Sequence, residues 1–213
     1  MIGSELLRYN KNQKFLLFDF ETMHLNLATG NFPWQCAFLI ATQYQILEQH
    51  NIYINWGKKL KVSRDAARIT GFNPELVKRE GLDPLEAYKK FRTYLDNPQL
   101  IVVGHNILSF DTYVERIWAQ EVGESHSWDY LNRAIDTNCL AKAIKKNIKP
   151  DMENFLAWQY RLTSLIESGL KTSLSTLTKE YNIETNAKDF HKGDKDIIYN
   201  LEIFKKQIRE IEI

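Results

Sequence analysis

Hydrophobic residues near the start of the chain are spaced as in strands. Two short apolar runs, residues 15–20 and 35–42, are typical of buried strands. Residues 46–55 alternate between apolar and polar with a period of about two, as in a strand with one exposed face. The second and third segments therefore predict a hairpin that turns near Tyr44 and Gln45.

Helical spacing dominates the rest of the chain. The clearest helix opens at Asp83-Pro84, and the last one begins near residue 195. Apolar residues at core spacing in these two helices are Leu85, Tyr88, Phe91 and Leu95, then Ile197, Leu201, Phe204 and Ile208. Further helices are expected over residues 64–70, from Pro74, and over residues 108–122, 151–166 and 173–181.

Two later strands separate these helices. Residues 100–103 predict a central strand that ends at Gly104, and Ile135, Asp136 and Thr137 predict a strand end followed by a helix start. Strands that alternate with helices after a front hairpin indicate an α/β sandwich around a mixed sheet. With 213 residues, 44% of them hydrophobic, one compact domain over residues 1–213 is expected.

The charge balance and the cysteine content limit the kinds of partner and compartment that the sequence predicts. Lys and Arg number 28 against 27 Asp and Glu, so a broad basic surface for long duplexes is not indicated. Cys36 and Cys139 lie far apart and are interpreted as reduced core residues of a cytoplasmic protein. The first residues lack the apolar core of a signal peptide, and no run is long enough to cross a membrane.

Acidic residues occur where predicted strands and helices meet. Asp19 and Glu21 follow the first apolar run, and residues two apart in a strand face the same side. Asp111 follows the strand at 100–103, in the first turns of a helix. His191 and Asp196 would lie roughly 140° apart on one continuous helix, because each residue turns about 100°.

The last helix is therefore expected to start after the histidine. Gly193 and an N-cap at Asp194 would place Asp196 in the first turn and leave His191 on a lead-in loop. We expect this loop to be mobile without substrate.

Four carboxylates that converge on one point repel one another unless cations neutralise them. Mg²⁺ and Mn²⁺ prefer oxygen ligands, and a neighbouring histidine can lose and regain a proton near neutral pH. Asp19, Glu21, Asp111, His191 and Asp196 together predict a two-metal phosphodiesterase.

Each residue also has a simpler interpretation. A D-x-E sequence at a strand end is common by chance, and an acid such as Asp111 suits a helix N-terminus. Turn or cap roles are expected for three further acids, Asp136, Asp189 and Asp194. His105 is expected to orient the Asn106 loop. Surface, turn or solvated positions are expected for His24, His50, His126, Lys142, Lys145, Lys146 and Lys149, and core positions for most tryptophans.

Together the three segments resemble the motifs of the DEDDh (DnaQ-like) family of 3′–5′ exonucleases, in the ribonuclease H-like superfamily. The matching residues are Asp19-Phe20-Glu21-Thr22, His105-Asn106-Ile107-Leu108-Ser109-Phe110-Asp111, and His191 with Asp196 five residues later. The tyrosine subclass would need a tyrosine four residues before an aspartate in the third segment, and none is present. The sequence departs from the family at Met23-His24-Leu25 and at Gly193, where alanine is usual; the second departure is expected to affect loop flexibility alone.

The resemblance implies a three-layer ribonuclease H-like sandwich with a five-stranded mixed sheet. It implies that Asp19, Glu21, Asp111 and Asp196 hold two Mg²⁺ or Mn²⁺ ions, that His191 is the general base, and that nucleoside 5′-monophosphates are released. Substrate contacts are expected from Thr22, Met23, Asn106 and Phe110. Single-stranded DNA 3′ ends are the expected substrate, and a polymerase or replication protein is a further partner that the resemblance suggests.

Alternatives from other classes remain. An exoribonuclease would use the same residues, because discrimination against the 2′-OH depends on pocket geometry. A non-catalytic nucleic-acid or polymerase-binding module would not need all five key residues intact. A metal-dependent phosphotransferase or an endonuclease on a related fold is a further alternative. Endonucleases of the ribonuclease H type generally lack the third motif.

Overall fold

One mixed sheet lies at the centre of the described chain. The computed structural model describes residues 3–28, 30–186 and 190–212, and in them five strands are arranged in the order β3-β2-β1-β4-β5. Their bounds are β1 Lys14–Thr22, β2 Pro33–Ala41, β3 Ile46–Tyr53, β4 Leu100–Gly104 and β5 Ala134–Asp136. β2 is antiparallel to β1 and β3, whereas β4 is parallel to both β1 and β5. The predicted five-stranded mixed sheet is confirmed.

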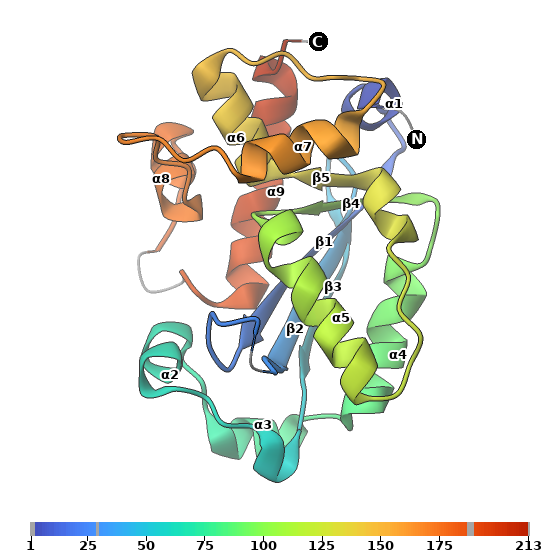
Figure 1. The fold of residues 1–213 in the computed structure, drawn as a ribbon, viewed down its shortest axis with the longest axis vertical. Coiled ribbons are helices and arrows are strands. Elements are labelled where there is room, and N and C mark those ends of the chain that lie inside the picture. Colours follow the sequence, from blue (N-terminus) through green and yellow to red (C-terminus); the bar gives the residue numbers. More distant parts are fainter. Residues whose placement is uncertain (1–2, 29, 187–189, 213) are drawn as a thin grey trace.

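Helices cover both faces of this sheet (Figure 1). The α-helices are α1 Gly3–Leu7, α2 Arg64–Thr70, α3 Pro74–Glu80, α4 Pro84–Leu95, α5 Asp111–Glu121, α6 Thr137–Lys146, α7 Phe155–Thr163, α8 Leu174–Glu180 and α9 Gly193–Glu210. Short 3₁₀ turns occupy Gly57–Lys59, Ile107–Ser109 and Asp129–Arg133.

Alternation along β1 divides the core into two layers. Leu16, Phe18 and Phe20 face one side and join the aromatic cluster of α4 and α5. Phe15 and Leu17 face the other side, where they pack against α6, α7 and α9. Asp19 and Glu21 continue this second series, so the strand period directs both carboxylates to the α9 side of the sheet.

Local capping explains most helix starts. Ser63, Asn73 and Asp83 each accept backbone N–H groups from the first turn of the helix that follows. At the hairpin, the Thr42 N–H donates to the Gln45 carbonyl at 2.9 Å, as the spacing predicts.

Three helix starts differ from the prediction. The segment expected as a helix over 108–122 begins as a 3₁₀ turn, and α5 proper starts at Asp111 because Phe110 (φ −138°, ψ −70°) is not helical. α7 starts at Phe155 instead of residue 151, since Asp151 holds a turn by accepting the Asn154 N–H. The predicted N-cap at Asp194 is wrong.

α9 begins at Gly193, with Lys192 as its N-cap residue. The N–H groups of Lys195 and Asp196 both donate to the Lys192 carbonyl, so Asp194 already belongs to the first turn. Asp189, predicted as a turn or cap residue, lies outside the described residues.

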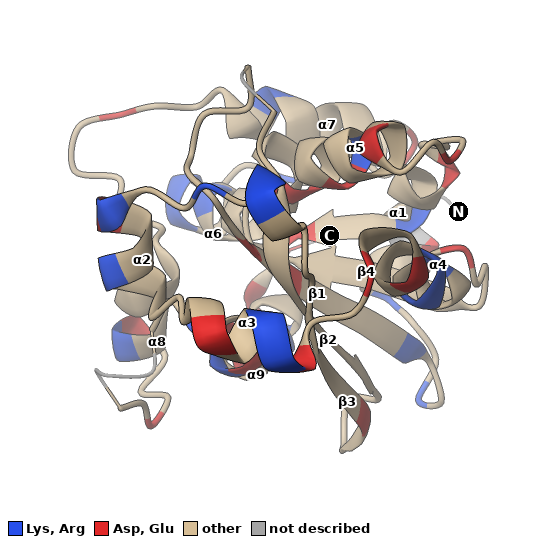
Figure 2. Cartoon of the chain, turned by 90° about the horizontal axis from the view of Figure 1, so that it is seen from below, with Lys and Arg blue, Asp and Glu red and all other residues tan. Residues whose placement is uncertain are grey.

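Several polar residues expected at the surface have partners. His126 Nδ1 lies 2.8 Å from Oε2 of the buried Glu115, so the surface interpretation of His126 is wrong. The His50 ring stacks on Phe38 with centroids 4.5 Å apart. Basic and acidic segments are interspersed over several helices (Figure 2). The four lysines of the α6 region contact carbonyls or acids, namely Lys142 to Leu162, Lys145 to Glu180, Lys146 to Glu167 and Lys149 to Glu212.

The remaining core predictions hold. Cys36 and Cys139 are buried free thiols. Trp34, Trp56, Trp118 and Trp158 are buried, and Trp128 is half-buried. No helix among the described residues is both long and apolar enough to cross a lipid bilayer.

Candidate active site

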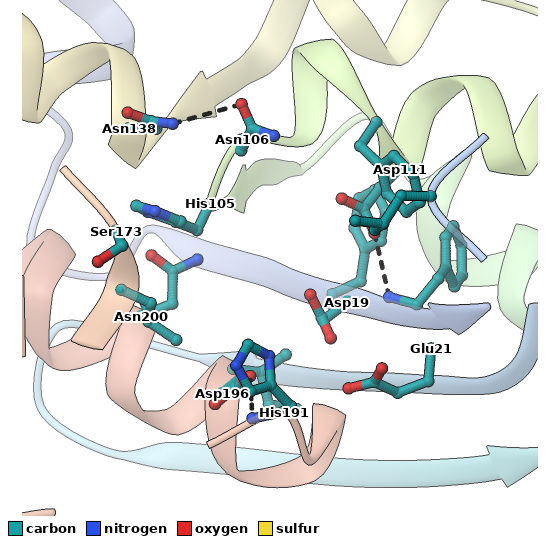
Figure 3. A pocket seen from close by; sticks show the side chains of 16 residues that line it. Asp19, Glu21, His105, Asn106, Asp111, Asn138, Ser173, His191, Asp196 and Asn200 are labelled. Atoms are coloured by element: carbon teal, nitrogen blue, oxygen red, sulfur yellow. Dashed lines mark hydrogen bonds between the residues drawn. The ribbon is translucent and has the colours of Figure 1, made fainter. Parts of the chain in front are cut away.

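Three carboxylates converge at the C-terminal end of β1. Asp19 and Glu21 come from that strand, and Asp196 comes from the first turn of α9, which packs on β1 and β2. One ligand oxygen of each side chain lies within 4.8 Å of the other two (Figure 3). The two-residue spacing in β1 and the position of α9 on the same face of the sheet produce this arrangement.

Gly193 permits the close approach of α9. A Cβ atom there would lie 3.1 Å from the Ala37 Cβ and 3.3 Å from Asp19 Oδ2. The glycine is therefore a packing position between α9 and the sheet, and the expectation that it affects loop flexibility alone is wrong.

Asp111 enters the same pocket from the other layer. It is the first residue of α5, is 4% exposed, and its Oδ1 accepts the Phe20 N–H at 3.1 Å. This bond ties α5 to β1 between the two strand carboxylates. Among the described residues Asp111 lines the pocket with the other three acids, but it is not part of their 4.8 Å group.

His191 lies on the segment that leads into α9, as predicted. Its backbone adopts φ 62°, and its N–H donates to Asp196 Oδ2 at 3.0 Å. The side chain lines the pocket beside Asp196 (Figure 3). The expected mobility of this segment stays a prediction.

Burial raises the pKa of all four carboxyls in the pocket, and repulsion between neighbouring acids adds to it for Glu21, Asp111 and Asp196. Desolvation raises the pKa of Asp19 to about 6, and desolvation together with the charge of Asp19 raises that of Asp196 to about 8. The pKa values of Glu21 and Asp111 lie well above their ordinary range, mainly because of burial and then because of neighbouring aspartates. Protons or cations must therefore neutralise the cluster near neutral pH.

The donor set fits hard divalent cations. All the converging ligand atoms are carboxylate oxygens, which Mg²⁺ and Mn²⁺ prefer. Asp196 Oδ1 is buried and has no hydrogen-bond partner among the described residues. A buried anionic oxygen without a donor is the type of atom that a bound cation satisfies.

The predicted substrate residues are distributed over two adjoining cavities. Asn106 lines only the first, a pocket of about 440 Å³ that also holds the acids, and Phe110 lines both. Thr22 lines the second, a groove of about 840 Å³. Met23 lines neither of them: its side chain is buried, and its Sδ accepts the Lys61 N–H.

Sequence reasoning missed the far wall of the pocket. Asn138, Ser173 and Asn200 line it, from the starts of α6 and α8 and from the second turn of α9. No motif marks them, because three separate elements contribute them.

His105 and Asp136 both have structural roles near the Asn106 loop. The His105 ring contacts Thr137 Oγ1 at 3.0 Å, and burial lowers its pKa to about 4, so it is neutral. The N–H groups of Asn106 and Leu108 donate to the two oxygens of Asp136 at 2.9 and 3.1 Å. Asp136 therefore holds the Asn106 loop, in addition to its predicted cap on α6. That His105 also orients this loop stays a prediction.

Comparison with solved structures shows one recurrent likeness. An E. coli exonuclease I–single-stranded DNA complex with bound zinc matches with a TM-score of 0.72 and 19% identity, over 91% of this chain and 40% of that one. E. coli exonuclease I with a dT13 oligonucleotide matches with a TM-score of 0.70 and 20% identity, over 92% and 41%. A product-bound exonuclease I gives 0.69 and 18%, over 90% and 42%.

These matches confirm the fold class, a ribonuclease H-like α/β sandwich. The chain spans about two fifths of the length of the exonuclease I chains that it matches. No protein-family model and no curated protein sequence matches it.

Proposed function

We propose that this chain is a metal-dependent 3′–5′ exonuclease that releases nucleoside 5′-monophosphates from single-stranded DNA. The observation that carries the proposal is the convergence of Asp19, Glu21 and Asp196 within 4.8 Å, in one pocket with Asp111 and His191. The solved structures of similar fold include exonuclease I bound to single-stranded DNA and to product, which supports the same reaction class.

The carboxylates would hold two Mg²⁺ or Mn²⁺ ions. Asp19 would hold metal together with Glu21 and Asp196, since its charge acts on both of these neighbours. Asp111 keeps one oxygen on the Phe20 N–H and has the other to support a second ion, directly or through water. Bound divalent cations would neutralise the cluster, lower the pKa of a bound water and stabilise the leaving oxygen.

His191 would take the proton from the attacking water. Its backbone bond to Asp196 places the imidazole at the edge of the acid cluster, where a base near neutral pH is useful. The water oxygen forms a bond to phosphorus, the bond from phosphorus to the 3′ oxygen breaks, and that oxygen gains a proton from solvent. The products are a nucleoside 5′-monophosphate and a strand with a new 3′-OH.

The adjoining groove would receive the terminal nucleoside. Its lining is mostly apolar, with Phe20, Leu25, Ile69 and Phe110 among the residues, and its volume of about 840 Å³ exceeds that of a nucleoside. Thr22 lies where the groove meets the acids. An apolar groove suits an unpaired base, which favours single-stranded ends.

We also propose that residues 1–213 form one domain. A polymerase or replication protein is a candidate further partner of this domain. Leu6, near the start of the chain, and Ile211, near its end, belong to the same core cluster, which supports a single folding unit. The two buried free thiols are consistent with the expected cytoplasmic location.

The test uses 5′-labelled single strands of DNA and RNA with free or blocked 3′ ends, in Mg²⁺, Mn²⁺ or EDTA. A metal-dependent ladder that shortens only from free 3′ ends, faster on DNA, is the expected result. Faster loss of RNA would reassign the substrate to RNA. No cleavage of either strand in any metal would contradict the proposal and favour a binding module.

A further inference from the structure

The pocket wall opposite Glu21 is built from uncharged amides, and these are not used in the proposed chemistry. Asn106, Asn138 and Asn200 lie there, on the β4–α5 connection, α6 and α9 respectively (Figure 3). We call this set the amide wall. Three separate elements supply the same functional group to one side of one cavity.

Two members of the amide wall keep free N–H groups. Asn200 is 3% exposed, and its Oδ1 accepts the Thr137 hydroxyl at 2.7 Å. Asn106 Oδ1 accepts from Asn138 Nδ2 at 3.3 Å. In both cases the carboxamide oxygen is engaged inside the protein, and the Nδ2 group has no acceptor among the described residues.

Each of these amides is held in place. Asn106 adopts φ 63°, a left-handed conformation that asparagine tolerates better than most residues, and Asp136 binds its backbone N–H. Asn200 is fixed by Thr137, which also contacts His105. Donors with restricted side chains lose little entropy when they bind a ligand.

The free Nδ2 groups of Asn106 and Asn200 match a phosphate oxygen, whereas the free atom of Asn138 is its buried carboxamide oxygen. Free N–H donors select an acceptor, and no Lys or Arg lines this pocket among the described residues. The basic stretch around Lys145 is already paired with Glu180 and Glu167. A second phosphate beside the acid cluster must therefore rely on neutral donors.

We propose that the Nδ2 groups of Asn106 and Asn200 bind the phosphodiester next to the scissile one, on the strand side. This assignment rests on the proposed function, in which the apolar groove takes the terminal nucleoside and the amide wall faces the remaining strand. Asn138 is a positioning residue, since its Nδ2 donates to Asn106 Oδ1 and leaves the Nδ2 group of Asn106 as the free end of that carboxamide.

The experiment replaces one phosphate at a time. Single-turnover removal of the terminal nucleotide is measured on a DNA strand with a methylphosphonate at the linkage next to the scissile one, and on the all-phosphate strand. A hydrogen bond to a charged acceptor implies that wild type cleaves the modified strand about ten- to hundredfold more slowly. A strand with the methylphosphonate several linkages upstream is the substrate control.

Variants of the amide wall test whether its asparagines cause the slower cleavage of the methylphosphonate strand. Asn200→Ala and Asn138→Ala should each slow cleavage of the all-phosphate strand and bring the ratio between the two strands toward one. Asn132→Ala removes an exposed asparagine on η3, outside the pocket, and should keep the wild-type ratio. Thermal melts show that each variant is folded, and either pocket variant suffices if the other does not fold.

The outcomes separate the two proposals. Equal cleavage of both strands by the wild type would overturn the amide-wall assignment and leave the exonuclease intact. A variant that slows both strands by the same factor would also overturn it, because the asparagine would then act elsewhere. Wild-type protein that cleaves no strand would remove the exonuclease proposal and this inference with it.

Discussion

The backbone N–H of His191 donates to Asp196 Oδ2 at 3.0 Å, so one carboxylate both organises the lead-in to α9 and faces the acid cluster. Its other oxygen, Oδ1, is buried and has no donor among the described residues. The structural role of Asp196 needs an acceptor atom, whereas the proposed metal role needs a negative charge. Asparagine keeps the acceptor oxygen and removes the charge, so this substitution tests the two roles separately.

Asp196→Asn should therefore keep the fold and lose most activity. The amide oxygen can still accept the His191 N–H, but the charge that a cation would bind is gone. Because desolvation and Asp19 raise the pKa of Asp196 to about 8, its removal should raise the apo melting temperature. The gain would be about 2–4 °C for each kcal/mol of repulsion relieved. Differential scanning calorimetry with and without Mg²⁺ checks this.

The Mg²⁺-induced rise in melting temperature should shrink in the same variant. Asp129→Asn, an exposed acid on η3, is the matched control and should leave both melting temperatures unchanged. A drop in apo stability of Asp196→Asn would show that the carboxylate holds the α9 lead-in through its charge.

His191→Ala should lower kcat by about 10²- to 10⁴-fold, the usual contribution of a positioned general base. Metal binding should persist, because no histidine is among the converging ligand atoms. The comparison variant is His50→Ala on β3, which should retain near wild-type turnover. Unchanged turnover of His191→Ala would exclude the histidine as the base.

Stability without metal should fall as pH rises. The pKa of Asp19 is raised to about 6 and that of Asp196 to about 8, so the native state keeps protons that the unfolded chain has lost. The free energy of unfolding then decreases with pH between about pH 4 and pH 8. Denaturant titrations in EDTA at several pH values measure this slope.

Mg²⁺ should reverse that trend. Cations compete with protons for the same oxygens, so stabilisation by Mg²⁺ should be larger at pH 8 than at pH 5. Asp19→Asn should flatten the slope in EDTA. A metal-free protein that becomes more stable toward pH 8 would mean that other groups dominate and that the carboxyls are not strained.

Sequence patterns predicted those parts of the site that are local in the chain. The two-residue spacing of Asp19 and Glu21 follows directly from the strand period, and the angle between His191 and Asp196 correctly separated the loop from the helix. The starts of the helices capped by Ser63, Asn73 and Asp83 could be predicted, because each cap side chain binds an N–H group within three residues of it. The sheet followed from the apolar runs.

What the sequence did not disclose depends on long-range contacts. The asparagines of the amide wall are 32 and 62 residues apart along the chain, and no sequence pattern links residues at these separations. The same is true of His126, whose partner Glu115 is buried and accepts hydrogen bonds from Tyr88 and Arg92 of α4. The predicted N-cap of α9 was two residues late, Asp194 instead of Lys192. The packing of Gly193 against Ala37 is likewise a tertiary contact that no local pattern reports.

Asp136 offers a test of the scaffold behind the pocket. Its buried carboxylate accepts N–H groups from Asn106, Leu108, Asn138 and Cys139, so it joins the β4–α5 connection to the start of α6. Asp136→Ala would leave several buried N–H groups without an acceptor, and each unpaired N–H group costs about 1–3 kcal/mol of folding free energy. We expect a loss of about 3 kcal/mol or more in urea unfolding, together with weaker substrate binding because Asn106 is released.

Asp83→Ala separates this role from ordinary capping. Asp83 is an exposed N-cap whose carboxylate accepts from Leu85 and Glu86 within its own helix, so its loss should cost about 1 kcal/mol and leave activity unchanged. Equal losses in the two variants would show that Asp136 is only a helix cap. A larger loss in Asp136→Ala, with a raised KM, would show that one buried carboxylate sets the geometry on which the substrate pocket depends.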